Sequence, residues 1–336
     1  NHIAASADGH PALGTVAIVA PGNLCVATWQ AMVEALICGN RVLIRPGSGD
    51  PRAAENLRAV LARVDREMAE RVEVLRFERD DQAAWRDMLG RAHGLMVYGG
   101  DSTVDRVAAL AEDAGFAGPI RRHGHGVSMA ILPAAILADE AQLAGLAPAL
   151  AHDALLADGR GCLSLRAVLV EGALPAERWE GIADVLAEAM AAAALELTQG
   201  HIATDLLASR RLLIEEAEFV AATAPGQALL RHDAVAGWAI VGWPQRRQLD
   251  PRALGPGARC LVMLPLAHRN ELATALAPMR RWLSTLGVPR SSIGLGHVAL
   301  SAGFDRVCAL GQMQAPKADR PTNGYKPGQL LRAAGD

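Results

Sequence analysis

The chain has 336 residues, of which 51% are apolar and 21% are charged, and this is enough for one large core or for two domains. Its 33 basic and 36 acidic residues give a formal net charge of −3 without any block of Lys or Arg, so a nucleic-acid partner is not expected. The longest uncharged run, residues 11–33, contains Pro21, Gly22 and Asn23, which excludes it as a membrane-spanning helix.

The cysteines bear on the cellular location of the protein and on whether it holds disulfides or a metal. No signal peptide is recognisable before the uncharged run, and the five cysteines, at positions 25, 38, 162, 260 and 308, form neither a CxxC pair nor a Cys/His cluster. A disulfide framework and a metal site are therefore not expected, and a reducing cytoplasm is the predicted location. The basic residues are almost all Arg, because only Lys317 and Lys326 are lysines.

The first elements alternate between strand and helix. An apolar, β-rich run at residues 14–20, ended by Pro21, predicts a buried parallel strand. Apolar residues then recur at helical spacing over residues 25–38, and Gly39 supplies the stop.

The alternation continues over about 120 residues. Residues 41–45 predict a second strand, and Asp50 and Pro51 predict the N-cap and first position of a helix over residues 51–71. Further strands are expected at 72–76 and 94–98, and further helices at 80–91 and 102–115. This pattern predicts a doubly wound parallel sheet, whose ligands bind beyond the carboxyl ends of the strands. No GxGxxG fingerprint follows the first strand.

A second α/β unit follows a polar loop that contains His123 and His125. Its expected strands are 127–132, 167–170, 236–242 and 259–264, and its expected helices are 134–157, 175–198, 209–223 and 268–286.

Cys162 is the sharpest chemical signal in the sequence. It stands in the segment GRGCLS, between a Gly-rich turn and an apolar strand, where the glycines leave room for a substrate and for backbone N–H groups aimed at an oxygen. A thiolate nucleophile that attacks a carbonyl carbon needs both. The alternative is a buried, inert cysteine, and the other four cysteines, which lie within apolar runs, are interpreted in that way.

Asn23 and the two histidines are weaker candidates. The Asn23 side-chain amide, at the end of the first strand, can donate to an oxyanion, or it can make a turn hydrogen bond to its own backbone. His123 and His125 are interpreted as loop residues, because no third ligand at a recognisable spacing points to a metal.

Taken in order, these segments resemble the aldehyde dehydrogenase superfamily, and more closely its acyl-CoA reductase branch, the LuxC-type reductases of bacterial luminescence. APGNLCVATWQAMVEALICGNRVLIRP resembles the superfamily's Pro-x-Asn-Phe-Pro segment with the helix, Gly-Asn turn and Lys-Pro strand that follow it. VYGGDSTVDRV resembles the branch's Tyr-Gly-Gly-Asp motif, and GRGCLSLRAVLVE resembles the nucleophile motif. GFDRVCALGQMQAPKADRPTNG resembles the branch's C-terminal signatures.

The resemblance implies a fold and a set of site residues. The implied fold is α/β and aldehyde-dehydrogenase-like, with two doubly wound, Rossmann-like domains and the active site in the cleft between them. The implied catalytic residues are Cys162 as the thiol, Asn23 as the oxyanion amide, and His123, which would poise the thiol or relay a proton. The implied cofactor-binding residues are Pro21, Gly22, Arg45, Pro46, Ser48, Gly99, Gly100 and Thr103.

Two departures from the family pattern refine the expected reaction. His123 aligns where hydrolytic aldehyde dehydrogenases carry a general-base Glu. The absence of that Glu favours thioester reduction over acid production. Arg45 replaces the usual Lys, and Ser48 aligns with the acidic residue that contacts the adenosine ribose. Without that carboxylate a 2′-phosphate meets a cation, so NADPH is the predicted cofactor, with NADH as the alternative.

The predicted activity is reduction of an acyl thioester to an aldehyde, with CoA or a phosphopantetheine thiol as the leaving group. The predicted domains are residues 1–130 for NADP(H), residues 131–310 for catalysis, and a C-terminal tail, 311–336, that returns to the cofactor domain or to an oligomer interface. The chain begins at Asn1, and the N-terminal part of the cofactor domain is expected to be missing. An acyl carrier protein and a second copy of the chain are the expected partners.

Three alternative functions stay open at this point. The enzyme can run in the opposite direction and oxidise an aldehyde with NAD(P)+, with or without acylation of CoA. The chain can be a catalytically silent module that only binds the cofactor, or an acyltransferase that uses Cys162 without nicotinamide. Helix 134–157 and the Trp-containing segment 238–243 are candidate walls of an acyl pocket, with core packing as the default explanation for both.

Overall fold

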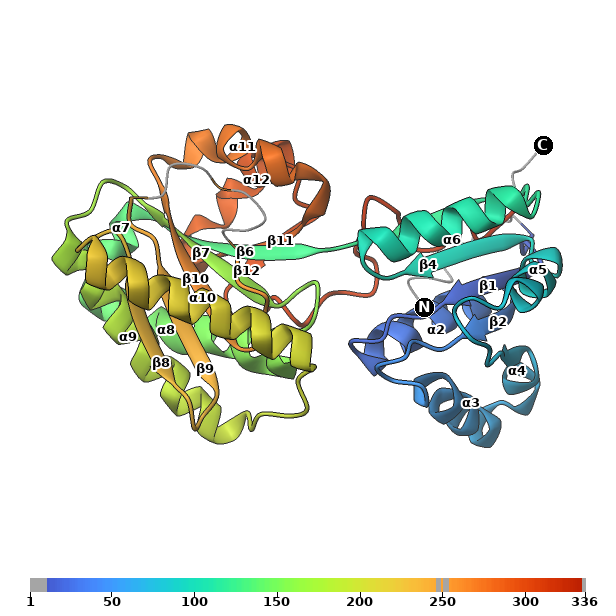
Figure 1. The fold of residues 1–336 in the computed structure, drawn as a ribbon. Coiled ribbons are helices and arrows are strands. Elements are labelled where there is room, and N and C mark those ends of the chain that lie inside the picture. The colour runs from blue at the N-terminus through green and yellow to red at the C-terminus, as the bar shows by residue number, and fades with distance from the viewer. Residues whose placement is uncertain (1–10, 246–248, 250–253, 334–336) are drawn as a thin grey trace. The chain divides into compact units, whose positions relative to one another are not determined.

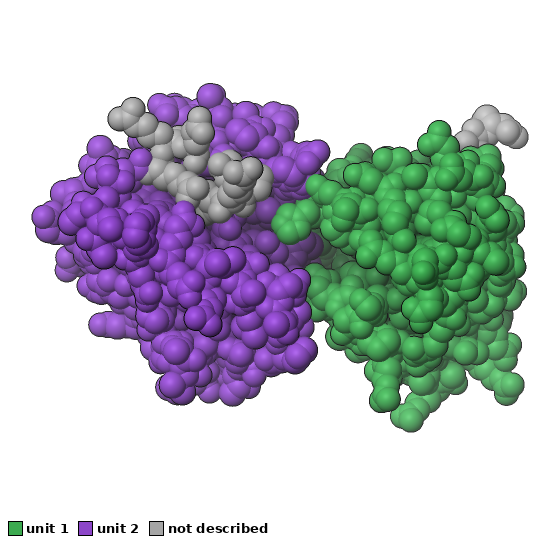
Figure 2. Space-filling model, in the orientation of Figure 1, with its two compact units in different colours: residues 1–125, 317–336 green, residues 126–316 purple. Residues whose placement is uncertain are grey.

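The computed structural model describes residues 11–245, 249 and 254–333, and the chain divides into two compact units (Figure 2). Unit 1 consists of residues 1–125 and 317–336, and unit 2 of residues 126–316. The boundaries predicted from the sequence lie after residues 130 and 310. Over the described residues, no helix is both long enough and apolar enough to cross a bilayer.

Unit 1 contains a five-stranded sheet in the order β3-β2-β1-β4-β5, and all its strand pairs are parallel (Figure 1). Its strands are β1 Thr15–Val19, β2 Arg41–Arg45, β3 Val72–Val74, β4 Gly94–Tyr98 and β5 Ile120–His123. Its helices are α2 Cys25–Ile37, α3 Ala53–Val64, α4 Arg66–Glu70, α5 Gln82–Gly90 and α6 Asp101–Asp113.

The sheet of unit 1 is buried on both faces. In β1, Val16 and Ile18 pack with α2 and α3, whereas Ala17 and Val19 pack with α5 and α6. Successive side chains of a strand point to opposite faces, so a continuous apolar run is what a doubly covered parallel strand requires. The predicted doubly wound architecture is confirmed.

Unit 2 contains a seven-stranded sheet in the order β12-β11-β6-β7-β10-β9-β8. Its strands are β6 Val127–Leu132, β7 Leu165–Glu171, β8 Leu229–Asp233, β9 Trp238–Gly242, β10 Cys260–Leu266, β11 Leu283–Val288 and β12 Arg306–Ala309. Among the strands that the structure describes in unit 2, only the pairing of β8 with β9, at one edge, is antiparallel.

Helices cover both faces of this second sheet as well. The α-helices are α7 Ala134–Leu137, α8 Glu140–Leu155, α9 Ala176–Glu196, α10 Thr204–Thr223, α11 Leu272–Ala275 and α12 Gly296–Ala302, and the 3-10 turns are η1 Leu156–Gly159, η3 Arg269–Glu271, η4 Ala277–Trp282 and η5 Arg290–Leu295. Helices α8 and α9 pack on one face, and α10, α11 and α12 pack on the other (Figure 1).

Two long helices predicted from the sequence are each broken by an aspartate. Residues 51–71 form α3 and α4, because Asp65 leaves the helical conformation and its carboxylate accepts the N–H of Met68 (2.9 Å) as an N-cap. The helix predicted at 134–157 is likewise split, since Asp139 caps α8. The predicted N-cap at Asp50 is wrong: α3 begins at Ala53, and its N-cap position makes no side-chain hydrogen bond.

The helix predicted at residues 268–286 is wrong. This segment contains η3, α11 and η4, and it ends in strand β11, whose six residues are all buried. Short apolar runs do not distinguish a buried strand from a buried helix by periodicity alone. Strands β5, β8 and β12 were also not predicted, because each is short and contains Arg, His or Asp.

A buried ion pair fastens the C-terminal segment inside unit 1. The Glu34 carboxylate accepts a hydrogen bond from Arg121 Nη1 (2.7 Å) and another from the N–H of Gly328 (2.7 Å). The two charged side chains are 9% and 3% exposed. Asn40 adds a hydrogen bond to the carbonyl of Leu331 (2.9 Å), so polar groups of α2 and its C-terminal turn hold the returning chain.

We predict that Glu34→Ala destabilises unit 1 by about 3–5 kcal/mol, because it leaves the Arg121 guanidinium buried without its carboxylate. Urea unfolding measures the loss. The control is Glu67→Ala, which removes an exposed i,i+4 partner of Arg71 and is expected to cost about 0–1 kcal/mol. Equal losses in the two variants would contradict the prediction.

Candidate active site and cofactor edge

Cys162 lies in a tight turn immediately before β7. The N–H of Ser164 donates to the carbonyl of Gly161 (3.1 Å), and the N–H of Gly161 donates to the Ser164 hydroxyl (3.1 Å). Cys162 occupies the second position of this turn and is exposed. Within the described part of the chain, no group accepts a hydrogen bond from its N–H. The turn therefore presents a thiol together with an unused backbone donor.

Ser128, the second residue of β6, anchors the nucleophile turn. Its hydroxyl donates to the carbonyl of Cys162 (2.6 Å) and accepts the N–H of Thr285 on β11 (3.1 Å). Ser128 is completely buried, so this hydroxyl ties the turn to two strands at the centre of the sheet.

Close backbone packing also fixes the position of Cys162. A Cβ at Gly126 would lie only 2.6 Å from the Cβ of Cys162, so no side chain fits there unless the nucleophile moves. Before the turn, Ala157, Asp158 and Gly159 have left-handed backbone with φ of 54°, 55° and 65°. Such conformations cost free energy and cluster at functional sites, where the surrounding structure imposes them.

A second left-handed run supports the first one. Gly257, Ala258 and Arg259 have φ of 79°, 52° and 62°, and the N–H of Arg259 donates to the carbonyl of Asp158 (3.1 Å). The Arg259 guanidinium pairs with the Asp158 carboxylate (3.3 Å), and both side chains are buried. This ion pair holds the strained segment that leads to Cys162.

The other four thiols differ from Cys162 in their burial. Burial raises the pKa of Cys38, and it raises the pKa of Cys260 to about 12 and the pKa of Cys308 to about 11. Cys25 is partly exposed on α2. All five cysteines lie in the described ranges, and only Cys162 is exposed, which makes it the most accessible of the thiols.

All the predicted cofactor-binding residues lie in unit 1, at or just beyond the carboxyl ends of three neighbouring strands. They are Pro21 and Gly22 after β1, Arg45, Pro46 and Ser48 at the end of β2, and Gly99, Gly100 and Thr103 after β4. Asn23 is exposed in the loop between β1 and α2. Cys162 belongs to unit 2, so the predicted cleft between the domains stays a prediction.

Two loops at this edge touch through their backbones. A Cβ on Gly47 would lie 2.6 Å from the Cα of Gly22 and from the carbonyl oxygen of Pro21, and a Cβ on Gly49 would lie 2.2 Å from the carbonyl oxygen of Gly22. Only glycine permits this approach. The loops after β1 and β2 thus form one joined surface of backbone.

The loop after β4 leads directly into α6. Gly100 is the N-cap of this 13-residue helix, and a Cβ on Gly99 would lie 3.0 Å from the Thr103 side chain. Helix N-termini present free N–H groups and a positive dipole end, which suits a phosphate.

Three arginines of unit 1, Arg45, Arg79 and Arg106, interact electrostatically near this edge. Burial lowers the pKa of Arg45, and the positive charge of Arg106 lowers it further. Burial and the charge of Arg79 lower the pKa of Arg106 in the same way. Glu78 and Asp80 act in the opposite direction. The positive charges of these arginines repel one another near the carboxyl end of β2, and this arrangement favours the binding of an anionic ligand.

The Arg45 side chain is held against aromatic rings. Its guanidinium lies 5.1 Å from the ring centre of Phe77 and 5.5 Å from that of Trp85, and its Nη2 donates to the carbonyl of Phe77 (3.3 Å). Cation–π contacts of this kind fix a guanidinium without neutralising it.

The loop placement predicted for His123 is wrong. His123 ends strand β5 and is only 3% exposed, and its ring stacks on Tyr98 with the centres 4.2 Å apart. Its Nδ1 lies 3.2 Å from Asn323 Oδ1. Burial, followed by the charge of Arg121, lowers the pKa of His123 to about 3, so the ring is neutral at physiological pH. Its neighbour His125 is exposed in the loop, as predicted.

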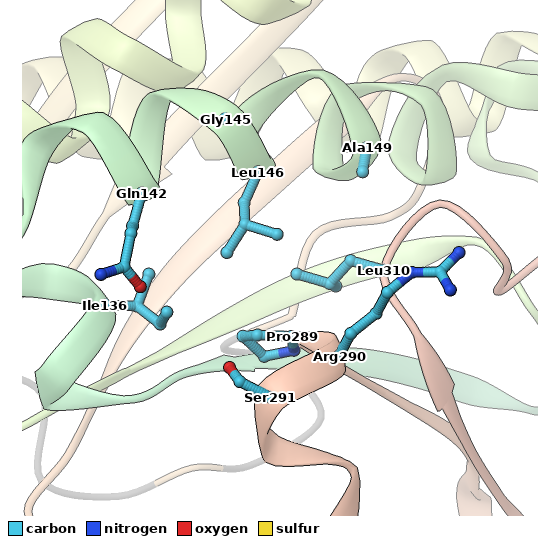
Figure 3. A pocket seen from close by; sticks show the side chains of 9 residues that line it. All are labelled: Ile136, Gln142, Gly145, Leu146, Ala149, Pro289, Arg290, Ser291 and Leu310. Atoms are coloured by element: carbon cyan, nitrogen blue, oxygen red, sulfur yellow. The ribbon is translucent and has the colours of Figure 1, made fainter.

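A cavity of about 430 Å³ opens at the other edge of the sheet of unit 2 (Figure 3). It is lined by Ile136, Gln142, Gly145, Leu146, Ala149, Pro289, Arg290, Ser291 and Leu310. These residues follow the carboxyl ends of β6, β11 and β12 or lie on α8, whereas Cys162 lies at the amino end of β7. The carboxyl ends and the amino ends of these strands are roughly 20 Å apart, which is the length of a six-residue strand.

The structure places the two segments that were candidate walls of an acyl pocket in different surroundings. Helix α8 lines a cavity, but that cavity is at the opposite edge from Cys162. Trp238 and Trp243 are 6% and 5% exposed and belong to the apolar clusters on the two faces of the sheet, which is core packing.

Sequence reasoning missed Ser128, Arg79 and Arg106. The available signal for Ser128 was one hydroxyl in an otherwise apolar strand, directly after the loop that carries Gly126. Arg79 and Arg106 gave no signal, because a single Arg on a polar loop or helix is normally a solvated surface residue.

The chain has the fold of aldehyde dehydrogenases. It aligns with aldehyde dehydrogenase 21 from Physcomitrella patens, solved with the reaction product succinate, at a TM-score of 0.67 and 16% identity over 94% of this chain and 64% of the other. A profile described as acyl-CoA reductase (LuxC) matches residues 6–332, and the chain belongs to this family.

Two further solved structures are similar to the same extent. The NAD-dependent benzaldehyde dehydrogenase from Corynebacterium glutamicum gives a TM-score of 0.66 and 16% identity over 89% of this chain and 64% of the other. The succinic semialdehyde dehydrogenase from Streptococcus pyogenes, with NADP+ as cofactor, gives 0.64 and 14% over 89% and 65%. The chain thus spans less than two thirds of their length. No curated protein sequence matches it.

We predict that His123 makes the stability of unit 1 depend on pH. Its pKa is about 3 in the folded chain and about 6.5 in an unfolded one, so the unfolded state binds the extra proton as pH falls. Stability is then lost from about pH 6.5 downward, by about 2 kcal/mol at pH 5. The measurement is urea unfolding at pH 7 and pH 5.

The pH comparison needs two variants. His123→Gln is expected to lose about 2 kcal/mol less than the wild type between the two pH values, since it removes the titrating ring. His152→Gln, which changes a half-exposed ring on α8, is the control and keeps the wild-type difference. If His123→Gln keeps it too, the low pKa is wrong.

Proposed function

We propose that this protein reduces an acyl thioester to an aldehyde through an acyl-enzyme on Cys162, with NADPH as the reductant. The observation that carries the proposal is the exposed thiol of Cys162 in a turn closed by Gly161 and Ser164, in a member of the acyl-CoA reductase family. This combination supports covalent chemistry at a carbonyl carbon.

In the first half-reaction, the Cys162 thiolate attacks the carbonyl carbon of the substrate thioester. The tetrahedral oxyanion takes hydrogen bonds from the N–H of Cys162 and from the side-chain amide of Asn23, and the CoA or phosphopantetheine thiolate then leaves with the electron pair of the broken C–S bond. One such donor is worth roughly 3–4 kcal/mol of transition-state stabilisation. The free N–H in the turn supports this assignment.

The residues at the carboxyl edge of unit 1 fit a dinucleotide. Gly22, Gly47 and Gly49 join the loops after β1 and β2 into one surface of backbone, and the N-terminus of α6 at Gly100 suits the pyrophosphate. When bound, the reduced nicotinamide supplies a hydride to the acyl group on Cys162, and the resulting thiohemiacetal collapses to the aldehyde and the free thiol. Pro21, Pro46, Ser48, Gly99 and Thr103 complete the proposed cofactor site.

The arginines near this edge favour NADPH over NADH in the proposal. Arg45, Arg79 and Arg106 offer positive charge to a 2′-phosphate, and Ser48 places no carboxylate beside it. The electrostatic cost of bringing these cations together is offset when a phosphate binds between them.

The proton-relay role predicted for His123 stays a prediction. A ring that is buried and neutral, with its Nδ1 beside Asn323, favours a structural part in holding the C-terminal segment on β5. A carrier protein as the acyl donor, assembly of several copies and a cytoplasmic location also remain part of the proposal.

We predict that Cys162→Ala abolishes NADPH-dependent aldehyde formation, whereas Asn23→Ala slows it by about 10²–10³, since it removes one oxyanion donor. The assay follows aldehyde and released thiol together across acyl-CoA substrates of increasing chain length. Cys25→Ala is the matched control and keeps wild-type rates. Aldehyde formation that persists in Cys162→Ala would overturn the proposal.

We predict that Arg106→Met weakens NADPH binding about tenfold or more and leaves NADH binding within about twofold. The reason is that only NADPH carries the 2′-phosphate that this charge attracts. Calorimetric titration with each cofactor measures the ratio. Arg86→Met, which changes an exposed arginine on α5, is the control. Equal weakening for both cofactors would place Arg106 away from the 2′-phosphate.

A further inference from the structure

The cavity at the carboxyl edge of unit 2 lies at a topological switch point of the sheet. Strands β6 and β11 are neighbours, but the chain leaves them toward opposite faces. After β6 it continues into α7 and α8, which pack on one face, and after β11 it continues through η5 into α12, which packs on the other. In open α/β sheets, ligands bind in the crevice outside the carboxyl ends of two such strands. The topology therefore predicts a ligand at this cavity.

The residues that line the cavity come largely from these two connections. Ile136 follows β6, and Pro289, Arg290 and Ser291 directly follow β11. Figure 3 shows the Leu146 side chain pointing from α8 toward the loop that carries Pro289. The volume of about 430 Å³ falls within the range of small-molecule sites, roughly 300–1,000 Å³. The apolar lining side chains, which would contact the hydrocarbon part of a ligand, are Ile136, Leu146, Ala149, Pro289 and Leu310.

Gly145 keeps the α8 wall of the cavity open. Gln142, Gly145 and Ala149 are spaced three and four residues apart, so they share one face of the helix. A glycine inside a helix is destabilising relative to alanine. A Cβ on Gly145 would meet no other described part of the chain within 4 Å, and its backbone is not left-handed. Neither packing nor backbone geometry requires a glycine here, and the missing side chain leaves space that a ligand can use.

Arg290 gives the cavity a positive charge. It is the one charged residue among the nine that line the cavity, all of which are described. Its side chain is exposed and forms no ion pair with a described carboxylate. The uncharged polar groups are the Ser291 hydroxyl and the Gln142 amide, whose Nε2 donates to Asp139 Oδ2 (2.8 Å). A cation beside an apolar cavity complements a ligand that has one negative charge and a hydrocarbon part.

We propose that this cavity binds a straight-chain aliphatic carboxylate. Its hydrocarbon chain packs against Leu146, Ala149 and Leu310, and its carboxylate lies near the Arg290 guanidinium. The site is distinct from the nucleophile turn, which lies at the amino end of β7. Binding here does not depend on the proposed reaction, so either one can fail without the other.

Calorimetric titration with carboxylates from butanoate to dodecanoate tests the site, with hexanol and octanol as uncharged comparators. The variants are Gly145→Leu, which fills the cavity from α8, and Arg290→Met, which removes the charge. Leucine is a better helix former than glycine, so Gly145→Leu keeps the fold. Its matched control is Gly181→Leu on α9, at another helix-interior glycine whose Cβ would meet no described atom within 4 Å. The control for Arg290→Met is Arg86→Met on α5.

The expected result is an affinity that rises about fourfold for each added CH₂ group and levels off once the cavity is full. Gly145→Leu weakens octanoate binding at least about tenfold, because the leucine takes the place of several CH₂ groups of the ligand. Arg290→Met weakens octanoate binding about three- to fivefold and leaves octanol binding unchanged. Both control variants match the wild type.

Three results contradict the proposal. Two concern the wild type alone: an affinity that does not rise with chain length, which includes the absence of binding, and octanol that binds as tightly as octanoate. The third is unchanged octanoate binding in Gly145→Leu, which places the ligand elsewhere in the chain. If light scattering then shows that Gly145→Leu has lost a dimer present in the wild type, a second copy of the chain and not a carboxylate occupies the cavity.

Discussion

Pairing between parallel strands is the constraint on which both units depend. Each parallel pair needs a crossover that packs on a face of the sheet, so both faces become covered and buried. Within each sheet, only the loops at the ends of the strands are then left uncovered by helices. In unit 1 the loops at the carboxyl ends of β1, β2 and β4 form the candidate cofactor edge, and in unit 2 the turn at the amino end of β7 carries Cys162.

Close contact between backbones sets the shape of both edges. The loops after β1 and β2 meet through Gly22, Gly47 and Gly49, and the nucleophile turn meets β6 at Gly126. At each place a Cβ would overlap a neighbouring atom, so the side-chain-free backbone is a requirement of the packing and not only of the turn. The fold and the shape of both candidate sites therefore depend on the same glycines.

Features that depend on a local sequence pattern could be predicted from the sequence. Continuous apolar runs between glycines located β1, β2 and β4, and the Gly-rich segment around Cys162 predicted an exposed thiol before a strand. Features that depend on contacts between segments far apart in the sequence could not be predicted. The burial of His123 depends on Asn323, 200 residues away, and β11 is a strand because β6 and β12 lie beside it. Ser128 acquires its role only because the turn before β7 and the strand β11 both lie beside it.

The use of arginine at buried positions also has a structural meaning. The structure buries Arg121 beside Glu34 and Arg259 beside Asp158. Desolvation lowers the pKa of a cationic side chain, and a lysine in such a place often loses its proton at neutral pH, whereas an arginine keeps its charge. Nη1 of Arg259 donates to both the Asp158 carboxylate and the carbonyl of Leu197. Arginine is therefore the residue that can hold a permanent charge inside these two sheets.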